Sequence, residues 1–163
     1  MRSFVLATAA AIVLAAVGAV VAARGATDVS WATRQFTFDV ILANATAPGF
    51  GRVKFRQPDD PPKIVFLDAS VRGLAPNHSY LLQRAVDVTL DGNCTSTAWL
   101  TLGKGLVPQA ITTDSTGAGH EELFRDLSAL ATGAQFDIHF RLIDAETSAP
   151  VLTSGCYRFA VRG

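Results

Sequence analysis

The chain has 163 residues, of which 49% are hydrophobic and 17% are charged, a composition typical of one compact domain with an additional apolar segment. Its 14 lysines and arginines balance its 14 aspartates and glutamates. Because a neutral field does not steer polyanions strongly, the sequence predicts no nucleic-acid partner.

The first predicted element is an apolar leader. Residues 4–23 carry no charge, follow Arg2 and end in small residues that suit signal peptidase. We therefore predict a signal peptide over residues 1–23 and a mature domain over residues 24–163. An uncleaved signal anchor is the alternative, because roughly 20 apolar residues suffice to span a membrane. In both cases the upstream charge places the domain outside the cytosol, either secreted or attached to the membrane through residues 4–23.

Beyond the leader, apolar and polar residues alternate with a period of two, which predicts β-strands. Glycine, proline and aspartate at the intervening positions predict tight turns. The pattern indicates an all-β fold, an antiparallel Greek-key sandwich or flattened barrel of about eight strands. The clearest strand candidates are residues 34–44, 51–57, 63–71, 79–88, 136–143 and 156–162.

Residues 51–57, GRVKFRQ, place three cations at alternate positions, Arg52, Lys54 and Arg56. On a strand these side chains share one face while Val53 and Phe55 point to the other. We interpret the cations as a solvated outer face, with a heparin-binding or headgroup-binding stripe as the alternative.

Residues 120–131, HEELFRDLSALA, fit two structures. Leu123, Leu127 and Leu130 would line one side of a helix. We instead predict a strand that leads into a long loop.

The chain contains two cysteines, Cys94 and Cys156. In an oxidising compartment an even pair in a small domain is typically bridged, so we predict a disulfide between them. Two buried free thiols are the alternative.

Six segments between Gly51 and Val161, a range that covers most of the mature chain, together resemble the copper-zinc superoxide dismutase family. Their order and spacing carry the resemblance, which also implies a bridge between the two cysteines. The segments are GRVKFRQ (51–57), VRGLAPNHSYLLQ (71–83), DGNCTSTA (91–98), TTDSTGAG (112–119), GAQFDIHFRLID (133–144) and SGCYRFAV (154–161).

The chain departs from that family at the metal site. Two copper-ligating histidines are represented by Leu81 and Gln83, and the arginine that guides superoxide by Thr153. Residues 95–112, where the bridging histidine and the zinc cluster should lie, contain no His, Asp, Glu or Cys. His139 alone falls on a copper-ligand position, and one imidazole does not make a catalytic copper site. We therefore predict no metal, no cofactor and no catalytic residue.

Other candidate groups also favour structural interpretations. We expect His139 to be half-exposed on the outer face of its strand and His78 and His120 to face solvent. The neighbouring acids Asp59-Asp60 and Glu121-Glu122 point to opposite faces on a strand, whereas acid-base catalysis needs two converging carboxylates. Calcium binding near residues 58–62 is a weaker alternative.

The function predicted from the sequence is therefore a non-enzymatic β-sandwich that serves as a secreted or cell-surface binding or structural module, with an unknown extracytoplasmic partner. One alternative is a diverged superoxide dismutase-like enzyme that binds copper through His139 with His78 or His120. Another is a membrane-anchored accessory subunit with Trp31 or Trp99 exposed at an interface, although we expect these tryptophans to fill the core.

Overall fold

The computed structural model describes residues 37–45, 48–59 and 61–163. The predicted leader and Trp31 lie outside the described residues. The described part of the chain is all-β and contains no helix, as the period-two pattern predicted. Accordingly, it holds no helix long and apolar enough to cross a membrane.

Eight strands of four or more residues form most of the sheet. Their alternating apolar residues explain why each segment is extended, since one face meets the core and the other meets solvent. The eight are β1 (Thr37–Ala43), β2 (Phe50–Arg56), β3 (Ile64–Arg72), β4 (Ser79–Asp87), β9 (Gly119–Asp126), β10 (Gln135–Asp144), β11 (Pro150–Ser154) and β12 (Tyr157–Ala160).

Four further strands of two or three residues bring the described total to twelve, rather than the eight predicted from the sequence. Segments this short carry no detectable periodicity, and pairing with a neighbouring strand is what defines them. They are β5 (Leu100–Thr101), β6 (Gly103–Lys104), β7 (Val107–Pro108) and β8 (Ala110–Thr112).

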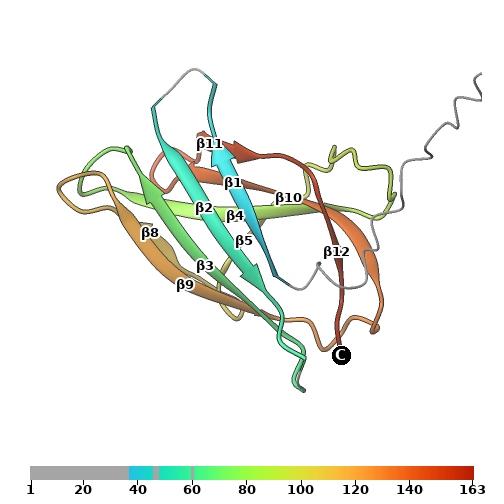
Figure 1. The fold of residues 1–163 in the computed structure, drawn as a ribbon. Helices are drawn as coiled ribbons and strands as arrows, with labels where there is room; N and C mark the ends of the chain where they lie inside the picture. The colour runs from blue at the N-terminus through green and yellow to red at the C-terminus, as the bar shows by residue number, and fades with distance from the viewer. Residues whose placement is uncertain (1–36, 46–47, 60) are drawn as a thin grey trace, which may run out of the picture.

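The strands form one sheet that curls into a nearly closed barrel. In Figure 1, β1, β2, β3 and β9 lie side by side in one layer, and β4 and β10 cross behind them. The layers are joined on one side where β11 pairs with both β10 and β1. On the other side β5 pairs with β4, and β6 pairs with β9, so residues 100–104 bridge the two layers.

The core lies between the layers and is made of the inward-facing residues of both. Val40, Leu82, Leu142 and Leu152 have no exposed surface. Aromatic rings fill one half of this space: Phe55 lies 4.6 Å from Phe38 and 4.8 Å from Phe159, measured between ring centroids. Such aromatic pairs stabilise a core beyond the area that they bury.

The segment that follows β4 lies across the outer face of the β4–β10 layer. The predicted disulfide between Cys94 and Cys156 is confirmed and ties this segment to the start of β12. Gly92 donates its backbone N–H to Asp137 Oδ2 over 2.7 Å, and the carboxylate also accepts from Arg158 Nε over 2.9 Å. Asp137 is therefore only 1% exposed. Asp137 lies on the outer face of β10, as His139 does, but the crossing segment covers it.

Residues 120–131 form a strand followed by a loop, so the preferred interpretation is confirmed and the helical one is wrong. β9 ends at Asp126, and residues 127–134 run without regular structure to β10. Leu123 faces the core, where it is 2% exposed. Leu127 packs against the core from the loop, while Leu130 is 38% exposed at its edge.

Candidate functional site

The three histidines lie at separate places in the barrel. His139 lies on β10, and its Nε2 is 3.0 Å from the Ser96 carbonyl oxygen. The Nε2 of His78 lies 2.7 Å from Asp144 Oδ2, and Asp144 is five positions beyond His139 along β10, about 17 Å in a strand. His120 lies on β9 in the other layer and contacts Asp68 at 3.0 Å. The predicted alternative in which His139 shares a copper ion with either histidine therefore lacks the necessary geometry.

His120 and His78 differ in exposure, and only His120 matches the prediction. His120 is exposed as expected, but the side chain of His78 is only 23% exposed and is held by Asp144. Four backbone or side-chain donors around Asp144, chiefly the Thr147 N–H and then His78, lower the pKa of this carboxyl to about 2. Among the described residues, no group of three or more His, Cys, Asp or Glu is arranged to hold a metal ion.

The positions that align with copper ligands in the resembling family lie on the outer face of β4. Leu81 is opposite Ile143, and Gln83 is opposite Arg141. Arg141 Nε donates to Gln83 Oε1 over 2.7 Å, and Gln83 Nε2 donates to Thr101 over 3.0 Å. The Gln83 amide thus bridges β10 and β5, a structural role.

Trp99 caps this outer face rather than filling the core. Its ring lies 4.6 Å from the His139 ring and 4.1 Å from the Arg141 guanidinium carbon. A guanidinium at this distance over an aromatic face is a favourable cation–π contact. The expectation that Trp99 is core filling was therefore wrong, because it is half-buried on the outer face, and its place at an interface stays a prediction.

The cation stripe on β2 has the predicted orientation. Arg52, Lys54 and Arg56 are exposed, whereas Val53 and Phe55 are 1% and 3% exposed. Arg52 forms an ion pair with Asp39 at 2.8 Å, and the hydrogen bond between them lowers the pKa of Asp39. Arg56 lies over the Phe66 ring. Two of the three cations thus have partners within the sheet.

The remaining predicted positions are also separated. Asp59 forms an ion pair with Arg162 at 2.7 Å, and Asp60 lies outside the described residues. Glu121 pairs with Lys104 at 2.8 Å, while its neighbour Glu122 is exposed on the other face of β9. Thr153 lies on β11, opposite Arg141. These residues form no common site.

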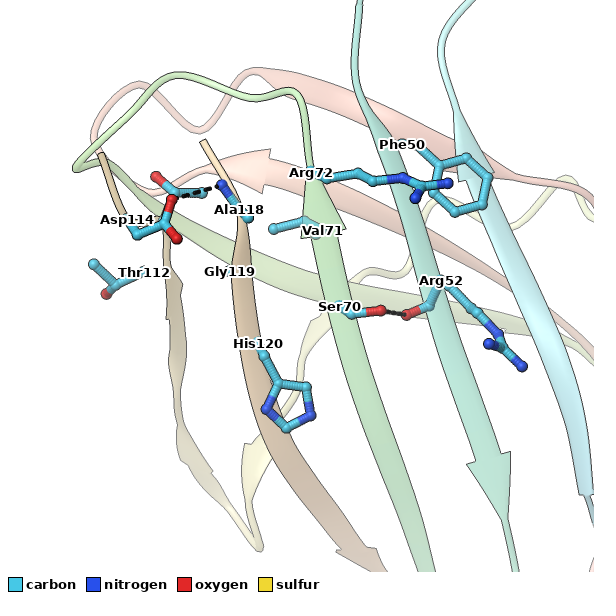
Figure 2. Close-up of a pocket in the computed structure, with 11 residues that line it drawn as sticks. Phe50, Arg52, Ser70, Val71, Arg72, Thr112, Asp114, Ala118, Gly119 and His120 are labelled. Carbon is cyan, nitrogen blue, oxygen red and sulfur yellow. Dashed lines mark hydrogen bonds between the residues drawn. The ribbon is translucent and has the colours of Figure 1, made fainter. Parts of the chain in front are cut away.

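Several hollows in the described part of the chain are large enough for a ligand. The first is a broad hollow of about 730 Å³ where β3 ends and β9 begins. Its polar groups are held by contacts within their own turn or strand pair, and Figure 2 shows Ser70 turned toward the backbone of Arg52 on the neighbouring strand. Asp114 accepts from the Ala118 N–H at 3.1 Å, and Arg72 lies over the Phe50 ring. Because these groups serve the local turn and the sheet, they do not converge on a common point.

The second cavity lies between the two layers at the opposite end, where β4 ends and β10 begins. Its volume is about 340 Å³, within the lower part of the range of about 300–1,000 Å³ usual for ligand pockets. The lining is mainly apolar, and Val88 and Leu130 at its edge are 86% and 38% exposed. The principal apolar lining residues are Phe55, Leu67, Leu102, Phe136, Phe140 and Phe159.

Two arginines also line this second cavity, and sequence reasoning missed them. On β4, the inward-facing positions are Tyr80, Leu82, Arg84 and Val86 in turn. Arg125 follows the inward-facing Leu123 on β9 in the same phase. The sequence pattern could have revealed them, because each arginine occupies a position of its strand at which the alternation predicts an aliphatic residue.

The chain matches no protein-family model, and no curated protein is significantly similar to it.

Proposed function

We propose that this chain is a non-enzymatic, extracytoplasmic binding module that holds a small apolar or amphipathic molecule in the cavity between β4, β9 and β10. The observation that carries the proposal is the cavity itself, which enters the barrel between its layers and is lined by core aromatic residues. An apolar concave site with a few polar groups is the usual form of a small-molecule site.

The cavity lining supports binding rather than catalysis. The lining consists of apolar side chains together with Arg84, Arg125 and Gln135. Arginine stays protonated at physiological pH and so is a poor proton acceptor, while glutamine does not titrate. These groups fix and orient a bound molecule but supply no general base or nucleophile from the lining.

The extracytoplasmic location is supported by the disulfide between Cys94 and Cys156, because such bridges persist in oxidising compartments. The apolar character of residues 4–23 supports it independently. Intact-mass measurement of the chain purified from its native host tests the processing: a chain starting near Arg24 supports a cleaved signal peptide, and an intact leader supports a membrane anchor.

The superoxide dismutase-like scaffold and its Greek-key connectivity remain part of the proposal. The order of the six sequence segments supports them, as does the bridge between the two cysteines. In this interpretation the scaffold persists without the redox centre, since Leu81 and Gln83 occupy ligand positions. Stoichiometric copper in the purified protein, with dismutase activity lost in His139→Ala, would instead support the enzyme alternative.

Binding of Nile red, a neutral dye that fluoresces in apolar surroundings, tests the proposed cavity. Val86 lines the cavity and is half-buried, so Val86→Phe should fill space and weaken dye binding at least tenfold. The matched control is Val107→Phe, at a position that is 69% exposed outside the cavity. Equal dye binding in the wild type and in a folded Val86→Phe variant would reject the cavity as the binding site.

A further inference from the structure

We propose that Arg84 and Arg125 form an anion-recognition pair and that the ligand is a single-chain carboxylate of the fatty-acid class, with its head group between the guanidiniums and its chain along the apolar lining. This inference rests on the proposed function, because it names the chemistry of the molecule that the cavity holds. The two arginines come from opposite layers of the barrel and line the same cavity.

The arginines are close enough to repel each other. Burial lowers the pKa of the Arg84 guanidinium, and the positive charge of Arg125 lowers it further. Two like charges inside a barrel destabilise the fold unless an anion or a hydrogen-bond network compensates them. A sequence that retains both charges therefore points to a compensating group.

The described residues supply little compensation. The Arg84 side chain makes no hydrogen bond to any of them, and the Arg125 side chain donates one, from Nη1 to the Gly105 carbonyl over 3.2 Å. The described residues that line the cavity include no carboxylate. Glu121 pairs with Lys104, and Asp87 accepts from Thr95 and Ser96. Asp126 feels the charge of Arg125, but it is exposed, accepts from the Ser128 N–H and does not line the cavity.

The shape of the cavity selects an amphipathic anion rather than an inorganic one. A guanidinium presents planar N–H donors that match the geometry of a carboxylate. The rest of the lining is apolar and continues to the exposed edge at Val88 and Leu130. A carboxylate with an unbranched hydrocarbon chain satisfies both parts of the site at once.

The direction of the ligand follows from the places of the two arginines. Arg125 contacts Gly105, beside the short strands that bridge β4 and β9, so the head group lies at that seam. Phe136 and Leu130 lie on the β10 and loop side of the same cavity, which the hydrocarbon chain would cover.

Displacement of Nile red by matched amphiphiles tests the inference on the purified chain. The series compares unbranched carboxylates of increasing length with primary alcohols and alkylammonium ions of the same length, below their micelle concentrations. We expect each carboxylate to bind at least tenfold more tightly than its alcohol, and the ammonium ion to bind most weakly. Each added methylene should tighten binding about fourfold until the cavity is full.

Substitution assigns the preference to the arginines. In Arg84→Gln and Arg125→Gln the affinity for the carboxylate should fall to that for the alcohol of the same length, with both affinities measured in the same variant. Arg84→Lys, which keeps the charge but not the planar fork, should retain part of the preference. Arg56→Gln, on the outer face of β2, is the matched control and should behave as the wild type.

The possible outcomes separate this inference from the proposed function. Equal affinities for carboxylate and alcohol in the wild type would overturn the anion pair and leave the apolar cavity standing. A carboxylate preference that survives both glutamine variants would also overturn it. If neither the dye nor any amphiphile binds, both proposals fail. Alkyl phosphates that bind more tightly than carboxylates of equal length would overturn the assignment of the head group.

Discussion

The two sides of the β4–β10 layer differ in whether their buried charges have partners of opposite sign. On the outer side, Asp137 is almost fully buried and is met by Arg158 and by the Gly92 N–H. On the inner side, three positions before the residue that pairs with Asp137, Arg84 faces Arg125 across an apolar cavity. The outer charges are complementary and the inner charges are alike.

This contrast separates a structural role for buried charge from a binding role. A buried carboxylate that contacts a guanidinium and a backbone N–H has its charge and hydrogen bonds satisfied within the protein. Its function is to hold the covering segment in place. A pair of guanidiniums in a cavity whose lining holds no carboxylate is incomplete, and we expect an anion that enters the cavity to complete it. The same layer thus provides an internal standard against which Arg84 and Arg125 can be tested.

The largest loss of stability is expected on removing the disulfide between Cys94 and Cys156, on the outer side. Removing the disulfide with Cys94→Ser and Cys156→Ser releases a loop closed over 62 residues and should destabilise the fold by about 4 kcal/mol in the chain-entropy model. Urea unfolding of the oxidised, reduced and double-serine proteins measures this. A reduced protein as stable as the oxidised one would show that the non-covalent contacts of the segment suffice.

The second-largest loss of stability is expected on removing the buried carboxylate of Asp137. Asp137→Ala removes the buried carboxylate that Arg158 and the Gly92 N–H contact and should cost about 3 kcal/mol in urea unfolding, because breaking a buried ion pair from one side is expensive. The matched control is Asp39→Ala, which removes an exposed ion pair with Arg52 and should change stability little. Equal losses in the two variants would contradict the complementary role of the outer pair.

The inner side should respond in the opposite direction. Arg84→Met removes one of two like charges and leaves apolar volume, so the unliganded protein should become more stable by about 1 kcal/mol. For a domain of this size that corresponds to a rise in Tm of about 4 °C. Thermal unfolding without amphiphile measures the change, and a loss of stability would show that Arg84 already has a compensating partner.

The sequence predicted the outer side of the β4–β10 layer better than its inner side. Alternation located the long strands because every second side chain of β2 or β10 meets the core. Cys94 and Cys156 were paired from parity and compartment alone. The burial of Asp137 was not predicted, because it depends on a segment 45 residues earlier in the chain that crosses over β10.

The cavity was not predictable from periodicity, because its volume depends on how far the two layers separate at one end of the barrel. Its charge was predictable in part. Arg84 occupies the same phase as Tyr80 and Leu82, which are 3% and 0% exposed, and this break in the pattern is visible in the sequence. The sequence does not show that Arg125 lies in the same cavity, because only the pairing of distant strands brings it there.

The smallest change in stability is expected at Asp144, the last residue of β10, whose carboxylate accepts hydrogen bonds from several donors. Because the folded-state pKa lies at about 2 rather than 3.8, this carboxylate stabilises the fold above pH 3.8, and that contribution disappears as the pH falls toward 2. Asp144→Asn should therefore flatten the loss of stability between pH 4 and pH 2 in urea unfolding. His78→Gln should leave most of that slope intact, since the Thr147 N–H contributes more to the lowered pKa than His78 does. An equal flattening by both substitutions would assign the effect to the imidazole, making this end of β10 an ion pair rather than a backbone-capped turn.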